Sequence, residues 1–175
     1  MNEQRHHMAP GEITALVTSY NTDPEALKLA VSSATTLGLC VIVCNDGSTE
    51  EATLAALGQI HNWNGCQVVH HESNQGTSAA LETAVAHATT PYVIKLDSDD
   101  KLIGLPCWEG DVNPDAVMAC LDPTGKWGDW DAPDGVFEFI ASPGPVLNGL
   151  TLKTEVARQV FKRLGMDAAD DITIG

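Results

Sequence analysis

The chain has 175 residues, with 9 Lys and Arg against 24 Asp and Glu, so its formal net charge at pH 7 is −15. This length predicts one domain, and 43% hydrophobic residues predict a packed core rather than a disordered acidic tail. The few basic residues are scattered, which disfavours a broad nucleic-acid-binding surface, because such surfaces cluster Lys and Arg. No apolar run approaches the roughly 20 residues that span a bilayer, so we expect no membrane segment.

The five cysteines are odd in number and include no Cys-x-x-Cys pair. This pattern predicts reduced, mostly buried thiols rather than a disulfide framework or a zinc site. The polar first ten residues do not have the pattern of a signal peptide. A cytoplasmic location is therefore expected.

Residues 11–100 alternate short apolar, β-branched runs with helical patterns that are punctuated by Pro, Gly and capping residues. Continuous apolar runs are typical of strands buried on both faces of a parallel sheet. Ser48 and Glu51 have the spacing of a capping box at the start of the second helix. Strands are expected at 13–18, 39–43, 67–71 and 92–96, with helices from Thr22 or Asp23 to Gly38, from Ser48 to about Leu57, and over 77–88.

Beyond residue 100 the pattern is less regular. Candidate strands lie at 116–121 and 136–141, and a final helix is expected from about Lys153 to Leu164. The alternation predicts an α/β fold, with a mostly parallel sheet flanked by helices. We expect a single domain, 1–175, with a regular half at about 11–100 and a small irregular half at about 101–175.

Polar residues directly follow each predicted strand, and in open parallel sheets ligands bind outside the carboxyl ends of the strands. Several carboxylates would meet at this edge, where they repel one another unless a cation is present. A hard divalent metal fits oxygen ligands of this kind. His70 and His71, at the end of the third strand, are interpreted as ordinary surface or half-buried residues. The four polar groups are Ser19-Tyr20-Asn21, Asn45-Asp46, Glu72-Ser73-Asn74 and Asp97-Ser98-Asp99.

The order of these motifs resembles the family 2 glycosyltransferases of the GT-A fold. The resemblance covers about residues 13–101 and implies a Rossmann-like, mostly parallel sheet. It also implies metal-dependent transfer of a sugar from a nucleoside-diphosphate sugar. The motifs that carry it are Thr18-Ser19-Tyr20-Asn21, Asn45-Asp46-Gly47-Ser48-Thr49, Asn74-Gln75-Gly76 and Leu96-Asp97-Ser98-Asp99-Asp100.

By this resemblance, Asp46 contacts the nucleotide base and Asp97 lies near the ribose and the metal. Asp99 is the direct ligand of a Mn²⁺ or Mg²⁺ ion that neutralises the departing diphosphate. The resemblance also implies that the nucleotide-sugar is bound by Ser19, Tyr20, Asn21, Asn74, Gly76 and Ser98.

The resemblance is weaker in the C-terminal part. Asp171 aligns best with the family's general base, and Asp170 is the second candidate. A carboxylate that takes the proton of an acceptor hydroxyl, with attack opposite the diphosphate, implies an inverting transfer. No His follows His87 to serve as a further metal ligand.

A UDP-sugar is the favoured donor, whereas the acceptor stays open among saccharide, lipid, protein, small molecule and modified nucleic acid. An alternative is a non-catalytic module that binds a nucleotide-sugar or carbohydrate. A GT-A-like nucleotidyltransferase is disfavoured, because it would need a glycine-rich basic loop where this chain has Ser19-Tyr20-Asn21-Thr22.

Overall fold

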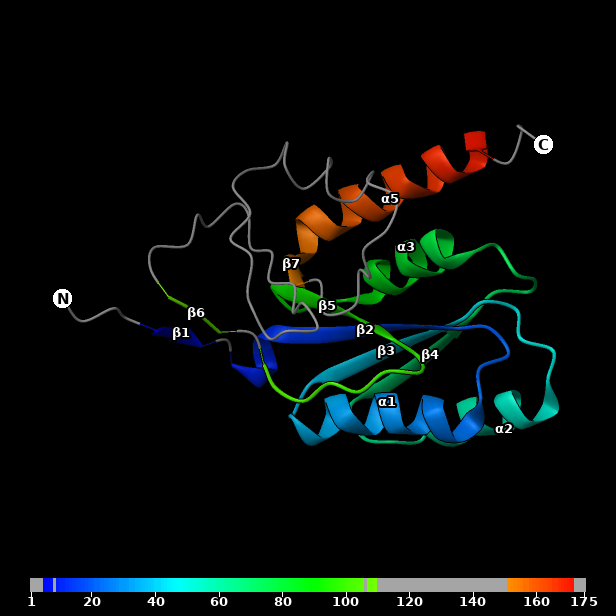
Figure 1. Ribbon diagram of the computed structural model, residues 1–175, viewed down its shortest axis with the longest axis horizontal. Helices are drawn as coiled ribbons and strands as arrows, with labels where there is room; N and C mark the ends of the chain where they lie inside the picture. Colours follow the sequence, from blue (N-terminus) through cyan, green and yellow to red (C-terminus); the bar gives the residue numbers. More distant parts are fainter. Residues whose placement is uncertain (1–4, 8, 106, 110–150, 172–175) are drawn as a thin grey trace.

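The computed structural model describes residues 5–7, 9–105, 107–109 and 151–171, with side chains described for 9–105 and 151–162. At its centre a five-stranded sheet lies between helices (Figure 1). Four strands are parallel, and β7 pairs antiparallel with β5. The expected α/β class, with a mostly parallel sheet flanked by helices, is confirmed. The strands, in their order across the sheet, are β4 (Cys66–His70), β3 (Cys40–Asn45), β2 (Ile13–Ser19), β5 (Tyr92–Asp97) and β7 (Thr151–Lys153).

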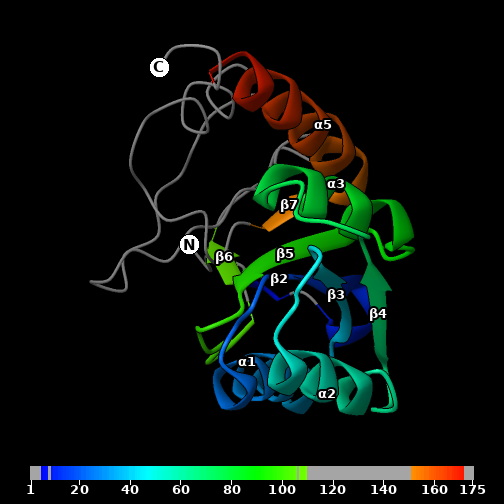
Figure 2. The same ribbon diagram turned by 90° about the vertical axis from the view of Figure 1, so that its right-hand side faces the viewer.

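Helices cover both faces of the sheet (Figure 2). Helices α1 (Pro24–Thr36) and α2 (Glu51–Ile60) pack on one face, and α3 (Thr77–His87) and α5 (Thr154–Asp171) pack on the other. A 3₁₀ turn, η1 (Pro10–Glu12), precedes β2. Strands β1 (Arg5–His7) and β6 (Cys107–Glu109) form a separate antiparallel pair. Among the described residues, no helix has the length and apolar character needed to cross a membrane.

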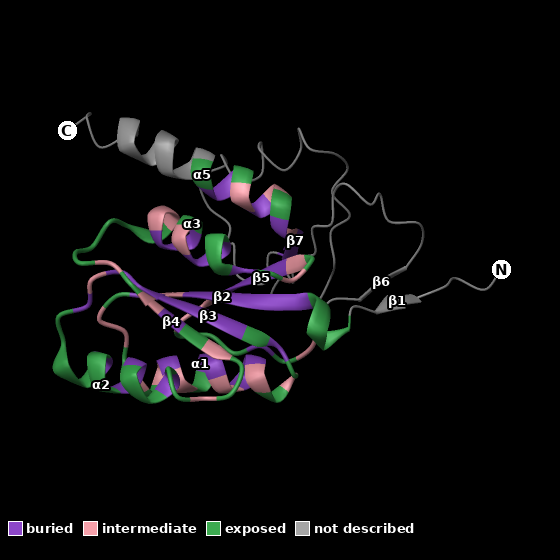
Figure 3. Cartoon of the chain, turned by 180° about the vertical axis from the view of Figure 1, so that it is seen from behind, coloured by how far each residue is buried: buried purple, intermediate pink, exposed green. Residues whose placement is uncertain are grey.

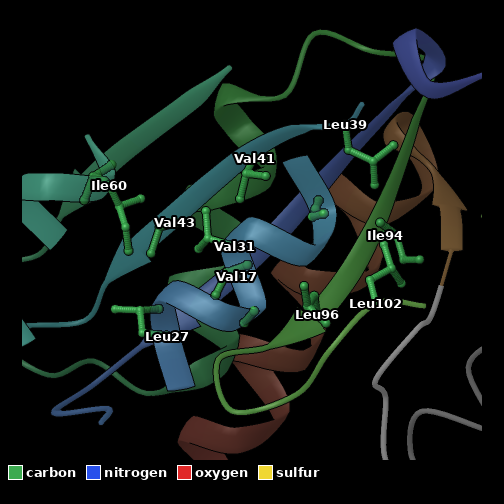
Figure 4. Packing of buried hydrophobic residues seen from close by; sticks show 14 of the residues in the cluster. Val17, Leu27, Val31, Leu39, Val41, Val43, Ile60, Ile94, Leu96 and Leu102 are labelled. Atoms are coloured by element: carbon green, nitrogen blue, oxygen red, sulfur yellow. The ribbon is translucent and has the colours of Figure 1, made fainter. Parts of the chain in front are cut away.

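The central strands β2, β3 and β5 are buried along most of their length because helices cover both of their faces (Figure 3). Alternate residues of β2 enter two different cores. Val17 packs with Leu27 of α1 and Leu96 of β5 (Figure 4), whereas Leu16 packs with Leu81 of α3 and residues of α5. The two cores fix the register of the sheet, since a one-residue slip would exchange them.

The predicted strands and the first three helices are confirmed to within a few residues. Asp23 caps α1 as expected, because its carboxylate accepts hydrogen bonds from the N–H groups of Glu25 and Ala26 at 3.1 and 2.9 Å. The last helix continues past the predicted end at Leu164 to Asp171. The predicted strands at 116–121 and 136–141 lie outside the described residues.

The predicted capping box of α2 is wrong. This helix begins at Glu51 after Glu50, whose side chain makes no capping hydrogen bond. Ser48 instead accepts a hydrogen bond from the N–H of Asn21, with 3.0 Å between N and Oγ. The cap of α2 comes from the loop after β2, which lies beside the loop after β3.

The strand order reverses between β2 and β5. From β2 the chain first builds β3 and β4 on one side, and then returns to place β5 on the other side. The loops after β2 and β5 therefore diverge at the carboxyl ends of adjacent strands, on the right in Figure 1. This is the point at which open α/β sheets leave a crevice for ligands.

Candidate functional site

A pocket of about 230 Å³ opens at this reversal point. It gathers three carboxylate residues, five Ser and Thr residues, and the half-exposed Tyr20. Of the predicted site residues, the pocket brings together Ser19, Tyr20, Asp46, Asp97, Ser98 and Asp99. The complete lining is Thr18, Ser19, Tyr20, Thr22, Asp46, Thr77, Asp97, Ser98 and Asp99.

Asn21, Asn74 and Gly76 are not among the lining residues. Asn21 has a positive φ of 48°, and its side-chain oxygen accepts hydrogen bonds from the N–H groups of Thr49 and Glu50 at 2.8 and 3.1 Å. It thereby caps α2 from the neighbouring loop. Asn74 accepts a hydrogen bond from the N–H of Gly76 at 3.0 Å, in the turn that precedes α3. In the structure these residues shape the loops around the pocket.

Gly47 allows the loops after β3 and β4 to touch. Its φ is +71°, and a Cβ added there would lie 2.4 to 2.6 Å from backbone atoms of Ser73 and Asn74. A side chain at this position would collide with the main chain and would also adopt a strained conformation. The glycine thus keeps Asp46 close to the start of α3.

Asp46 is buried, and hydrogen bonds hold both of its carboxylate oxygens. Oδ1 accepts from the N–H of Gln75 at 2.9 Å and lies 2.7 Å from Nδ1 of His71. Oδ2 accepts from the N–H of Gly76 at 2.8 Å. The carboxylate therefore caps the start of α3 while it lines the pocket.

His71 is half-buried, as interpreted from the sequence, but its contacts are not those of an ordinary residue. Its side chain is only 8% exposed, and its two ring nitrogens contact Asp46 and Thr83 at 2.7 and 2.8 Å. The backbone N–H of His71 also donates to the carbonyl of Asn45 at 2.9 Å. No motif in the sequence marks this contact, which joins the ends of adjacent strands.

The neighbouring His70 agrees better with the sequence interpretation. Its Nδ1 lies 3.1 Å from the side-chain nitrogen of Asn45, and the residue is exposed. Successive residues at the end of a strand point to opposite sides of the sheet, so the two histidines have different environments.

Asp97 and Asp99 follow β5 and differ in their surroundings. Asp97 is half-buried and forms an ion pair with the buried Lys95, whereas Asp99 is exposed. Hydroxyl groups join the loops after β2 and β5, because Thr22 Oγ1 lies 3.1 Å from Ser19 Oγ and 3.0 Å from Ser98 Oγ. This contact holds the two sides of the pocket together.

The oxygen atoms at the end of β5 fit a hard divalent cation. No cluster of three or more His, Cys, Asp or Glu side chains suited to a metal forms within the described part of the chain. Mg²⁺, by comparison, commonly uses one or two carboxylates and completes its shell with water and substrate phosphates. Asp97 and Asp99, which line the same pocket, can supply such a pair.

Near Asp46, burial and then the negative charge of this carboxylate raise the pKa of the Cys44 thiol to about 12. Cys44 Sγ also lies 3.7 Å from Nε2 of His71. Cys40, Cys44 and Cys66 are free thiols, as predicted, but the expectation of mostly buried thiols is not met by these three, since only Cys44 is buried. The raised pKa keeps Cys44 protonated and unreactive at neutral pH.

The two predicted general bases lie at the end of α5. The backbone of Asp170 and Asp171 belongs to the last turn of this helix, but their side chains lie outside the described ones. Helix α5 runs from β7 toward the end of the molecule that carries the carboxyl ends of the parallel strands (Figure 1).

The comparisons with known proteins match the half of the chain that contains the pocket. The family model described as "Glycosyl transferase family 2" matches residues 14–103, just over half of the chain. Chondroitin synthase and hyaluronan synthase, both from Pasteurella multocida, are each 36% identical to it over 87 residues. That stretch is 50% of this chain and only 8% of each synthase.

Similar solved structures include the mannosyltransferase PcManGT from Pyrobaculum calidifontis in complex with GDP-Man and Mn²⁺, which is 24% identical with a TM-score of 0.46. The alignment covers 53% of this chain and 29% of that one. The S. aureus TarS fragment 1–349 in complex with UDP-GlcNAc is also 24% identical, with a TM-score of 0.45. That alignment covers 51% of this chain and 27% of the TarS fragment.

Proposed function

The chain belongs to glycosyl transferase family 2, and from this premise we propose that it transfers a sugar from a nucleoside-diphosphate sugar to an acceptor hydroxyl. One observation carries the proposal. Asp46, Asp97 and Asp99 come from two separate parts of the chain, and they meet in one pocket at the reversal point between β2 and β5. The proposal covers the regular half of the chain, about 11–100, as the donor-binding part of a single domain.

Asp46 is the proposed contact for the nucleotide base. A carboxylate accepts hydrogen bonds and has about four lone-pair positions, three of which hold protein donors here. The remaining position, on Oδ2, is available for an N–H group of a base. The ring of Tyr20, which is 50% exposed at the edge of the pocket, offers an aromatic face for the same base.

The hydroxyl groups of Ser19 and Ser98 are the proposed partners of the ribose and the diphosphate. Asp97 and Asp99 would hold Mn²⁺ or Mg²⁺ at the end of β5. When bound, this ion supplies positive charge that stabilises the departing nucleoside diphosphate. Asn21, Asn74 and Gly76 contribute by fixing the loops that carry the direct contacts.

Asp171 is proposed as the general base of an inverting transfer, and Asp170 is its alternative. The role needs a carboxylate that takes the proton of the acceptor hydroxyl while the hydroxyl attacks the anomeric carbon. The sugar–phosphate bond breaks on the opposite side, and its electron pair leaves with the diphosphate. The small half at about 101–175 is the proposed acceptor side, and the acceptor itself stays open.

A UDP-sugar is the proposed donor, and the cytoplasmic location stays a prediction from the cysteine content. The chain spans a small part of the length of the two synthases. The alternative to an enzyme is a non-catalytic module that binds a nucleotide-sugar or carbohydrate. The two differ in turnover, since an enzyme releases nucleoside diphosphate repeatedly and a module only binds.

The test is release of nucleoside diphosphate from a panel of UDP- and GDP-sugars, with Mn²⁺ or Mg²⁺, in the presence of candidate acceptors. We expect metal-dependent turnover with at least one UDP-sugar. The Asp171→Asn variant should bind the donor normally but turn over roughly 100-fold more slowly, with Asp170→Asn as the matched control. Tight donor binding without turnover for any acceptor would favour the module, and a product that retains the donor's anomeric configuration would contradict inversion.

A further inference from the structure

The side chain of His71 is buried, and its Nδ1 points toward the carboxylate of Asp46. Both oxygens of the Asp46 carboxylate accept backbone N–H groups, and a carboxylate oxygen is an acceptor, so His71 Nδ1, at 2.7 Å, donates to Oδ1. Nε2 lies 2.8 Å from Thr83 Oγ1 of α3, on the far side of the ring from Asp46. The imidazole thus joins α3 to the carboxylate, and neither ring nitrogen is left to act as a base in the pocket.

The contacts of Asp46 limit what the carboxylate can still accept. Both lone-pair positions of Oδ1 are occupied, one by His71 and the other by the N–H of Gln75. Within the described part of the chain, Oδ2 receives one hydrogen bond, from the N–H of Gly76. Asp46 therefore presents a single acceptor position to a ligand in the pocket.

The number of acceptor positions bears on which base the pocket prefers. Guanine presents two adjacent donors, N1–H and the N2 amino group, which pair with both oxygens of a carboxylate. Uracil presents one N–H group, at N3, between two carbonyl groups, and it needs one acceptor. An Asp46 whose Oδ1 is blocked suits the second pattern and leaves one guanine donor without a partner, which is costly in a closed site.

We propose that His71 is a positioning residue that sets the base preference of the donor site. By occupying Oδ1 of Asp46, it favours uridine over guanosine diphosphates. The inference rests on the proposed function and adds the residue that selects the nucleotide. If His71 only stabilised α3, its replacement would change the stability of the protein but not the ratio of the two affinities.

Two substitutions of His71 separate its two hydrogen bonds. The amide nitrogen of Asn occupies nearly the position of Nδ1, so His71→Asn can keep the donor to Asp46 and lose the contact with Thr83. The longer His71→Gln places its amide near the position of Nε2 and leaves Oδ1 of Asp46 open. A third variant, Thr83→Val, removes the partner of Nε2 from outside the pocket and keeps the imidazole.

Isothermal titration with UDP and GDP in the presence of Mn²⁺ measures the ratio of the two dissociation constants, and thermal unfolding checks that each variant is folded. We expect the wild-type protein to prefer UDP by about tenfold or more, because one unpaired buried donor is worth about that factor. His71→Asn should keep this ratio within about threefold, and so should Thr83→Val, because the imidazole still occupies Oδ1 of Asp46. His71→Gln should reduce the ratio about tenfold, largely through tighter binding of GDP.

An unchanged ratio in folded His71→Gln would overturn the role of His71 and leave the proposed function intact. Where the Gln variant does not fold, a ratio about tenfold lower in folded His71→Asn or Thr83→Val, which keep a donor at Oδ1, would overturn it as well. A wild-type preference for GDP would do the same. Failure of the wild-type protein to bind either nucleotide would instead overturn the proposed function, and the inference with it.

Discussion

Two hydrogen bonds join Asn21, in the loop after β2, to Thr49, in the loop after β3. The side-chain oxygen of Asn21 accepts from the N–H of Thr49 at 2.8 Å, and its side-chain nitrogen donates to the Thr49 hydroxyl at 3.4 Å. This pair joins the loop after β2, which carries Ser19 and Tyr20, to the start of α2. The pair explains why α2 needs no cap from its own sequence.

The first prediction tests this cap. Asn21→Gly should cost about 1–2 kcal/mol of unfolding free energy, because two N–H groups lose their acceptor while the positive φ stays accessible. Asn21→Ala should cost about 1 kcal/mol more, because a Cβ is disfavoured at this φ. Urea unfolding measures both values, and equal stabilities of Asn21→Gly and the wild-type protein would show that the cap is dispensable.

The second prediction compares two glycines. Gly47→Ala should destabilise the protein by roughly 2–5 kcal/mol, because the new methyl group collides with the backbone of Ser73 and the φ is positive. Gly58→Ala, within α2 and with open space around its Cα, should stabilise by about 0.5–1 kcal/mol. Chemical denaturation of both variants is the measurement, and similar effects would mean that the contact between the loops does not restrict position 47.

The third prediction concerns alkaline pH. The pKa of Cys44 is raised by burial and by Asp46 from its ordinary value of 9.0 to about 12, so the folded state keeps the proton longer than the unfolded chain does. This contribution to stability is complete below about pH 9 and is lost as the pH rises from there toward 12. Unfolding free energies measured from pH 7 to 11 should therefore fall less steeply in Cys44→Ala than in the wild-type protein. Parallel curves would exclude the effect.

The fourth prediction compares the contributions of a buried and a surface ion pair to stability. Lys95→Met should cost about 1–2 kcal/mol, because half-buried Asp97 loses its buried cationic partner. Lys28→Met, which breaks the exposed pair with Glu25 on α1, should cost at most about 0.5 kcal/mol. Thermal unfolding of the two variants provides the comparison. A larger loss from Lys28→Met would mean that the Lys95 pair does not stabilise the fold.

Much of the fold follows from local features of the sequence. The apolar run from Ile13 to Thr18 has the length and composition of a strand covered on both faces, and Asp23 with Pro24 defines the start of α1. Polar residues after each strand also predict where the pocket lies, because parallel strands bring their carboxyl ends to one edge. These features depend on neighbours within a few residues.

Contacts between distant residues could not be predicted in this way. The cap of α2 and the partner of Asp46 come from loops 25 to 29 residues away in the sequence. Strand β7 has three residues, too few for a periodic signal. Helix α5 continues through Gly165, beyond the predicted end at Leu164, because one glycine within a helix costs only about 1 kcal/mol.

The central claim is that the pocket at the ends of β2 and β5 binds a nucleoside diphosphate together with a divalent cation. The most direct test is isothermal titration of UDP with and without Mn²⁺ for the wild-type protein, for Asp99→Asn, and for Asp100→Asn, which makes the same change of charge outside the pocket lining. We predict Mn²⁺-dependent binding that weakens at least about tenfold in Asp99→Asn and changes little in Asp100→Asn, because Asp99, unlike Asp100, is a proposed ligand of the cation. Equal Mn²⁺-dependent affinity in all three proteins, or the absence of UDP binding by the wild-type protein, would contradict this account.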